Sequence, residues 1–248
     1  MKKIFIILFS LTLSLFGYTS IKHLKYESGI SIYGQVGYVD LKLEENFDTQ
    51  TYFMQATTTS TGLVKVLTDN RIDTFTSNGQ IIDGVYKPLK FIKRTTQTDY
   101  EKLTTYTFDY ENNTVLKSQV KSEYKVISTF NINTFSHDDE RKLFVEKSSE
   151  TLKLEPNDYL SLYLNLKHGN LKVGTVEYVD KKDEDTLLFL GDNLFEVQKN
   201  FGEDNYKISM KHDEKSIFFK KIESIGISFY GDAYIEKLSE TTDIIESS

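Results

Sequence analysis

The sequence predicts a mainly β fold, an antiparallel meander curled into a closed or half-open barrel-like sheet with one helix and short helical turns. Segments with period-two alternation recur along the chain, separated by turns rich in Gly, Asn and Asp. Glycines also interrupt several segments, as expected where a strand bends or bulges. Aromatic residues are frequent, with 16 Tyr and 17 Phe but no Trp. Several predicted strands are apolar on both faces, and a curled sheet can bury both.

The chain begins with the pattern of a secretory signal peptide. Two lysines follow Met1, residues 4–16 carry no charge, and Gly17 comes next. This apolar run is shorter than the roughly 20 residues that span a bilayer, so we expect cleavage after residue 17, with a retained anchor as the alternative. Residues 1–17 are then the signal peptide. Residues 18–248 are expected in the periplasm as a single β-rich domain that does not span the membrane.

Charge and cysteine content exclude several classes of function. The formal net charge is −7 at pH 7, and no run of Lys and Arg supplies the basic surface that nucleic-acid binding requires. The chain has no cysteine, which excludes disulfides, a thiolate nucleophile and cysteine-based metal centres. We therefore expect no nucleic-acid partner.

The N-terminal region is expected to form a long hairpin. Residues 30–43 alternate with apolar side chains on both faces, and Gly34 and Gly37 are expected to bend this strand. The charged stretch 44–48 predicts a turn, and the alternation of residues 51–57 predicts the returning strand.

Further hairpins follow a helical corner. Leu63, Val64, Val66 and Leu67 are an apolar cluster that is expected to form one helical turn at the end of the sheet. Asn78-Gly79 is a strong signal for a hairpin turn, so the strand that starts at Arg71 is expected to end there. A second turn at Asp83-Gly84 is expected to lead into strands over residues 89–98, 103–110 and 115–120.

Two stretches in the middle of the chain are less regular. Residues 121–154 contain β-prone pieces around a charge-dense loop, and we predict a hairpin excursion from the meander. In residues 155–169, leucines at every second position favour a strand. An N-cap at Asn157 or Asp158 and the C-terminal Gly169 favour a helix. We predict a helix near residues 157–167.

The last third is expected to return to strands, over residues 171–179, 186–190, 194–199, 206–212, 216–220 and 222–237. Residues 226–231 repeat the pattern of residues 29–34. Chance similarity between two glycine-bent strands explains this repeat, and the alternative is that the two strands are neighbours that close the sheet. Residues 238–248 are acidic and serine-rich and are expected to be a frayed tail.

Several motifs in this layout occur together in one known family. They include the glycine spacing of residues 29–37, the corner Thr61-Gly62-Leu63-Val64, the stretch Asp158-Tyr159-Leu160-Ser161 and the closing Ile208-Ser209-Met210. The chain resembles a family of exported bacterial proteins known only as domain of unknown function 3108, loosely and over nearly the whole mature length. The resemblance implies a helix at the Asp158 motif. It implies no activity.

Residue patterns typical of catalysis or metal binding were not found. Residues 226–231 are one residue too long for the G-x-S-x-G turn of serine hydrolases. The four histidines stand far apart, without the spacing of metal ligands. The charged turn at residues 180–185 lacks the glycine and terminal glutamate of an EF-hand loop and is interpreted as a solvated charge run. We expect no enzyme, no metal site and no cofactor.

Two classes of function remain. A half-open sheet could line a cavity and carry an apolar envelope molecule, such as a lipid or other hydrophobic ligand. A sheet filled by its own side chains would instead be a non-catalytic structural or protein-interaction module that binds another envelope protein. The candidate cavity-wall residues are Tyr33, Phe53, Met54 and Tyr163.

Overall fold

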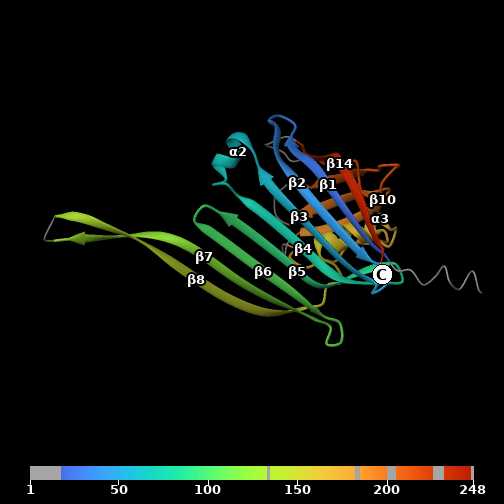
Figure 1. The fold of residues 1–248 in the computed structure, drawn as a ribbon, viewed down its shortest axis with the longest axis horizontal. Helices are drawn as coiled ribbons and strands as arrows, with labels where there is room; N and C mark the ends of the chain where they lie inside the picture. The colour runs from blue at the N-terminus through green and yellow to red at the C-terminus, as the bar shows by residue number, and fades with distance from the viewer. Residues whose placement is uncertain (1–17, 133–134, 182–184, 200–204, 226–231, 247–248) are drawn as a thin grey trace, which may run out of the picture.

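The computed structural model describes residues 18–132, 135–181, 185–199, 205–225 and 232–246. These residues form one antiparallel sheet of 14 strands, in the order β8-β7-β6-β5-β4-β3-β2-β1-β14-β13-β12-β11-β10-β9 (Figure 1). Its centre is the antiparallel pair of β1 (Tyr18–Ile30) and β14 (Ala233–Glu246), so the two ends of the chain lie side by side. The predicted antiparallel meander is confirmed.

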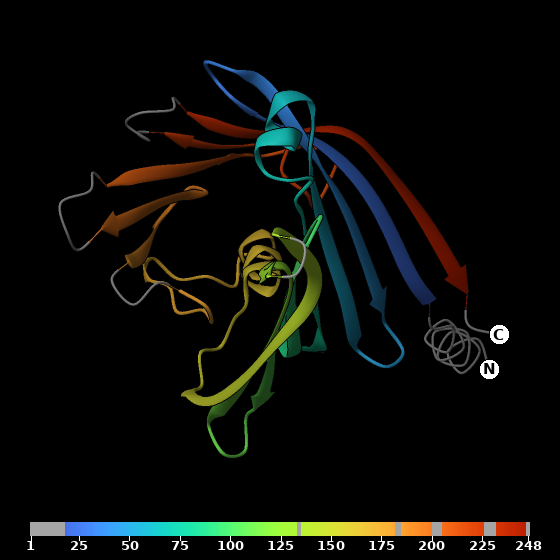
Figure 2. The same cartoon turned by 90° about the vertical axis from the view of Figure 1, so that its left-hand side faces the viewer.

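The sheet has two halves that extend from this central pair. The first half-sheet continues from β1 through β2 (Gly34–Asn46), β3 (Thr51–Ser60), β4 (Ile72–Ile82), β5 (Val85–Gln97), β6 (Tyr100–Asp109), β7 (Thr114–Asn131) and β8 (Ser136–Lys153). The second half-sheet continues from β14 through β13 (Lys221–Ile225), β12 (Tyr206–Lys211), β11 (Leu194–Lys199), β10 (Asp185–Gly191) and β9 (Gly174–Thr175). The sheet curls without closing, because β8 and β9 remain its two edges (Figure 2). The barrel-like sheet is therefore half-open.

Helix α3 (Tyr159–Lys167) lies inside the curl and confirms the predicted helix (Figure 2). Leu160 and Leu164 pack into the core of the first half-sheet, whereas Leu162 and Leu166 pack into a second core with β10 and β11. Two residues turn an α-helix by about 200°, so every second leucine faces the opposite side. The period-two pattern that resembles a strand therefore belongs to a helix buried on two faces.

Side-chain hydrogen bonds hold both ends of α3 against the first half-sheet. Asp158 caps the N-terminus by accepting from Leu160 N at 2.7 Å and Ser161 N at 3.0 Å, and its other oxygen accepts from Ser77 Oγ at 2.6 Å. Near the C-terminus, Asn165 accepts from Tyr86 N at 2.8 Å and donates to Tyr86 O at 2.9 Å. The helix is thus fixed in position and rotation.

Two turn predictions need correction. The strand expected over residues 30–43 is two strands, because residues 31–33 form the β1–β2 turn and Gly34 has φ +70°. Asn78-Gly79 is a β-bulge inside β4, not a hairpin turn, and the hairpin turn is at Asp83-Gly84. A Cβ at residue 79 would collide with the Lys87 carbonyl oxygen opposite, so this position requires glycine for close approach.

The apolar corner and the C-terminal end also differ from prediction. Helix α2 (Gly62–Leu67) forms as expected, but Leu63, Val66 and Leu67 are each more than 70% exposed and do not pack into the sheet. The tail expected to fray from residue 238 continues β14 to Glu246, because its backbone pairs with β1. Of residues 171–179 only Gly174–Thr175 form a strand, and residues 216–220 form none. The repeat at residues 226–231 lies outside the described residues.

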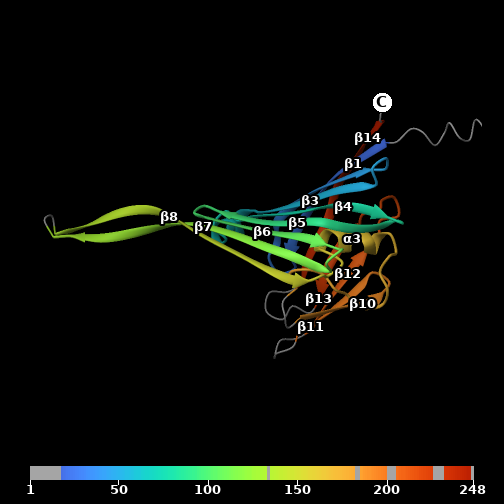
Figure 3. The ribbon, with the colours of Figure 1, turned by 90° about the horizontal axis from the view of Figure 1, so that it is seen from below.

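The predicted hairpin excursion is the longest hairpin of the sheet. Strand β6 pairs with β7 only up to Glu123, and beyond it residues 124–131 form a ladder with residues 136–143. Only the base of this segment still contacts the body in the described residues, where Tyr124 N donates to Asp99 O and Arg141 forms an ion pair with Asp99. This two-stranded segment, which we call the arm, projects from the body (Figures 1 and 3). The charge-dense loop expected from His137 belongs to β8.

A further property of the helices concerns the membrane. Among the described residues, no helix combines the length and the apolar character that a membrane crossing requires.

Candidate functional site: an apolar cavity beside helix α3

Helix α3 divides the interior into two regions. On the side of the first half-sheet, the part of the concave face that packs against α3 is closely filled. Leu43, Met54, Phe91, Tyr106 and Val115 are all fully buried there. The Phe91 ring lies 5.9 Å from the ring centres of both Tyr106 and Tyr159. Large interlocking side chains leave this side as a packed core.

On the other side of α3, toward the second half-sheet, the side chains leave a cavity of about 400 Å³. This volume lies within the range of roughly 300–1,000 Å³ that is usual for ligand pockets in proteins. The lining is mostly apolar and consists of Tyr159, Leu162, Tyr163, Leu166, Tyr178, Asp180, Leu187, Phe195, Val197, Tyr206, Ile208 and Met210.

Strand alternation explains which residues line the sheet wall of the cavity. Phe195 and Val197 are two residues apart on β11, and Tyr206, Ile208 and Met210 alternate on β12. Side chains at every second position of a strand share one face. Because β11 and β12 are adjacent in the sheet, these side chains form one continuous apolar wall opposite α3.

Asp180 is the polar end of this cavity. Its carboxylate forms an ion pair with Lys93 and accepts hydrogen bonds from the hydroxyls of Tyr106 and Tyr159. Burial, as the largest cause, raises the pKa of Tyr106 and of Tyr159 above the ordinary tyrosine value. Both hydroxyls therefore stay protonated at neutral pH and act as donors to Asp180.

Tyr163 is the one predicted wall residue that the structure places in this cavity. It comes from α3, and its ring packs edge-on against Phe219 with ring centres 5.4 Å apart. Its hydroxyl accepts a hydrogen bond from Phe219 N at 3.0 Å. Burial raises the pKa of Tyr163 to about 12, so the ring is held as a neutral, fixed part of the wall.

The other three predicted wall residues lie elsewhere. Tyr33 is 65% exposed in the β1–β2 turn. Met54 is fully buried in the packed core of the first half-sheet, and Phe53, next to it on β3, points to the opposite face. The structure therefore does not bring the four predicted residues together.

Most of the cavity wall was missed by sequence reasoning. The strands that carry Phe195, Val197 and Ile208 were predicted, but nothing in the sequence indicates which strands face the second side of α3. Asp180 was interpreted as part of a solvated charge run, and it is instead hydrogen-bonded to two tyrosines. The available signal was the leucine at every second position of α3, from Leu160 to Leu166. A helix with two buried faces must pack against two opposing walls.

Two buried carboxylates outside the cavity serve to hold α3. Asp158 is the N-cap described above. Glu45, 3% exposed, binds Lys22 Nζ at 2.6 Å and accepts from the Tyr86 hydroxyl, which in turn lies 3.2 Å from His168 Nε2 at the end of α3. Partial burial, the largest cause, lowers the pKa of His168 and so favours its neutral imidazole. Each carboxylate has specific partners that fix the helix.

The structure describes only part of the charged turn predicted at residues 180–185. Among the described residues, no group of three or more His, Asp or Glu side chains could hold a metal ion. Asp183 and Glu184 of that turn lie outside the described residues.

The resemblance to the domain of unknown function 3108 stays a prediction. No family model, curated protein sequence or solved structure matches this chain.

Proposed function

We propose that this protein is an exported carrier that binds an apolar molecule of the cell envelope in the cavity between α3 and strands β10–β12. The observation that carries this proposal is the cavity of about 400 Å³ with its mostly apolar and aromatic lining. Burial of apolar ligand surface in such a pocket is favourable at roughly 25 cal/mol per Å² removed from water.

The fixed position of α3 supports the same function. One wall of the cavity is the face of α3 that points away from the first half-sheet. Asp158 and Asn165 hold this helix against the first half-sheet. The ligand therefore does not have to order its own binding site. A preformed pocket avoids much of the entropy cost of binding.

Export remains part of the proposal. β1 begins at Tyr18, so cleavage after Gly17 would keep the whole described sheet in the mature chain. Mass spectrometry of the protein from a periplasmic fraction is expected to give a chain that starts at Tyr18. An intact Met1 terminus in a membrane fraction would contradict export with cleavage.

The binding proposal is tested by native mass spectrometry of freshly purified protein, followed by solvent extraction of the bound molecule. We expect a stoichiometric hydrophobic ligand on the wild type. Ile208→Trp places a large ring in the cavity and is expected to abolish this mass. Lys207→Trp, on the other face of β12, is the matched control and is expected to retain it. An apo mass for the wild type, or equal ligand loss in both variants, contradicts the proposal.

The arm favours a second candidate function, that of a module which binds another envelope protein. The arm exposes large apolar side chains at both strands and at its tip, among them Val126 (66%), Phe130 (53%), Ile132 (71%), Phe135 (80%) and Leu143 (51%). A two-stranded ribbon is marginally stable by itself in water, and exposed apolar patches mark interaction surfaces. A partner that covers the arm would explain both features.

Shortening the arm separates the two candidate functions. In one variant, Asn-Gly replaces residues 124–143. This two-residue turn would connect Glu123 to Phe144, its partner in the ladder. Native mass spectrometry measures the bound ligand, and chemical cross-linking in the periplasm captures any partner protein. If the protein is a carrier only, this variant keeps both the hydrophobic ligand and the cross-linking pattern of the wild type. If the arm binds a partner, the cross-link is lost while the ligand is retained.

A further inference from the structure

A second hollow lies on the same concave surface, beyond the N-terminus of α3. It has a volume of about 460 Å³ and is lined by Arg71, Asp73, Phe75, Lys93, Thr95, Gln97, Tyr100, Lys102, Thr104, Lys117, Gln119 and Asp180. We call it the polar groove. Asp180 lines both this groove and the apolar cavity, so the two hollows are neighbours that share this residue.

The polar groove is a continuation of the inner face of the first half-sheet. On β5, the buried Phe91 is followed at alternate positions by Lys93 and Thr95, so all three share one face. On β7, Val115 is followed in the same way by Lys117 and Gln119. The concave face thus changes from apolar to cationic and polar along its strands.

The charge of the groove is opposite to that of the whole chain. Four cationic side chains line it, against two carboxylates, whereas the chain has a formal net charge of −7. Positive side chains gathered on the wall of a concave surface raise the local potential and attract anions.

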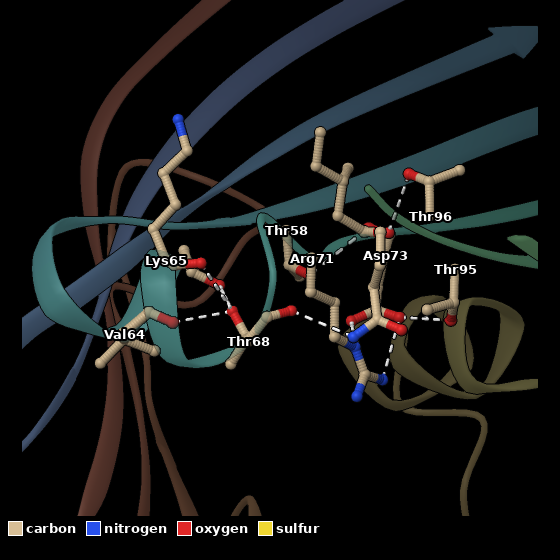
Figure 4. A network of polar contacts seen from close by, with 11 residues as sticks. Thr58, Val64, Lys65, Thr68, Arg71, Asp73, Thr95 and Thr96 are labelled. Carbon is tan, nitrogen blue, oxygen red and sulfur yellow. Dashed lines mark hydrogen bonds and ion pairs between the residues drawn. The ribbon is translucent and has the colours of Figure 1, made fainter. Parts of the chain in front are cut away.

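Both carboxylates of the groove are already paired. The Asp73 carboxylate binds the Arg71 guanidinium at 2.7 and 3.0 Å and accepts from Thr95 Oγ1 (Figure 4). Asp180 is paired with Lys93, as described above. These contacts leave the cationic character of the groove to Lys102 and Lys117.

Those two lysines are available to an incoming anion. Lys102 has no carboxylate partner among the residues that the structure describes. Lys117 Nζ binds Glu150 at 2.7 Å in a pair whose glutamate is 55% exposed, and exposed pairs contribute little stability. Exchanging this partner for a ligand anion therefore costs little.

We propose that the carried molecule is a single-chain anionic amphiphile, with its apolar chain in the α3 cavity and its carboxylate or phosphate group in the polar groove. This inference rests on the carrier function proposed above and adds the ligand class to it. The apolar cavity is near the small end of the usual pocket range, which favours one chain. Lys ammonium groups form charge-assisted hydrogen bonds with both kinds of head group.

Calorimetric titration with tail-matched probes tests the inference. The probes are dodecanoate, dodecyl phosphate and dodecyltrimethylammonium, each used below its critical micelle concentration, and dodecanol, used below its solubility limit. We expect the two anions to bind at least about tenfold more tightly than dodecanol, the effect of one charge-assisted hydrogen bond. Their relative affinities distinguish a carboxylate from a phosphate ligand. Added salt is expected to weaken the binding of the two anions and to leave the binding of dodecanol unchanged.

A double variant locates the effect in the polar groove. Lys102→Gln with Lys117→Gln is expected to remove the preference for anions and keep the affinity for dodecanol. Lys90→Gln removes one charge from the exposed outer face of β5. This control is expected to keep both the preference for anions and the affinity for dodecanol.

The outcomes separate this inference from the proposal beneath it. Equal binding of dodecanol and the anions, or tightest binding of the cationic probe, would overturn the anionic ligand and leave the apolar carrier standing. Failure of every probe to bind would overturn the carrier function, and the ligand class with it.

Discussion

The two sides of helix α3 use similar residues with different results. Toward the first half-sheet, long strands of 11, 13 and 10 residues (β4–β6) bring large side chains into contact and fill the space. Toward the second half-sheet, strands of 7, 6 and 6 residues (β10–β12) leave a cavity of about 400 Å³. The comparison indicates a division of roles, in which the core between α3 and the first half-sheet stabilises the fold and the other side of α3 is open to the apolar part of a ligand.

The largest expected difference concerns truncation of a side chain on each side. Phe91 is fully buried in the packed core, so Phe91→Ala is expected to lower the free energy of unfolding by about 3–5 kcal/mol. Ile208 borders an existing cavity, so Ile208→Ala is expected to lower the free energy of unfolding by about 1 kcal/mol or less. Urea unfolding followed by circular dichroism measures both. Equal costs would show that the two sides do not differ in packing.

The next effect concerns the contacts that hold α3 between the two sides. Asn165→Leu would leave the buried backbone N–H and C=O of Tyr86 without partners, at about 1–3 kcal/mol for each unpaired group. We expect a lower unfolding free energy and weaker binding of the hydrophobic ligand, because the helix forms one cavity wall. Asn170→Leu, at an exposed amide that bonds Gly84 O, is the control and is expected to have little effect on ligand binding. Unchanged ligand binding in Asn165→Leu would indicate that α3 is not a fixed wall.

A smaller effect depends on pH. Burial raises the pKa of Asp158 to about 6 from an ordinary value of 3.8, although hydrogen bonds from Ser77 and Ser161 oppose the rise. The folded chain therefore holds this proton more tightly than the unfolded chain. Its contribution to stability is full below the unfolded pKa and is lost as the pH rises through the folded pKa.

The substitution Asp158→Asn isolates this contribution. Asparagine keeps an acceptor for the helix N-terminus but does not titrate. We expect it to destabilise the protein more at about pH 4.5 than at about pH 7.5, by at most about 3 kcal/mol between the two. Urea unfolding of both chains at the two pH values gives this difference. A cost that grows with pH would contradict a raised pKa.

The comparison of the two sides also shows what the sequence could predict. The fold class, most strands and α3 follow from local alternation, glycine placement and the Asp158 cap. The prediction of a hairpin turn at Asn78-Gly79 was wrong because a bulge opposite Lys87 and Pro88 has the same local sequence as a turn. The C-terminal part of β14, residues 238–246, was missed because its stability comes from backbone pairing with β1, more than 200 residues away.

The candidate site was less predictable than the fold for a related reason. A cavity wall depends on which faces meet across the interior, and such long-range pairing is not written in any one segment. Tyr163 lines the cavity because α3 carries it between the two half-sheets, whereas Tyr33 and Phe53 were assigned from strands whose facing was unknown. The second side of α3 brings together segments from Tyr159 to Met210 that no local pattern connects.

Methyl NMR tests the different roles of the two sides most directly. Leu162, Ile208 and Met210 line the cavity, whereas Leu43 and Met54 lie fully buried in the packed core. With methyl-labelled protein and unlabelled dodecanol, we predict intermolecular nuclear Overhauser effects to the first three residues and none to the last two. Effects at Met54 and Leu43, or none at any of the five residues in the presence of bound dodecanol, would contradict the assignment of ligand binding to the second side of α3.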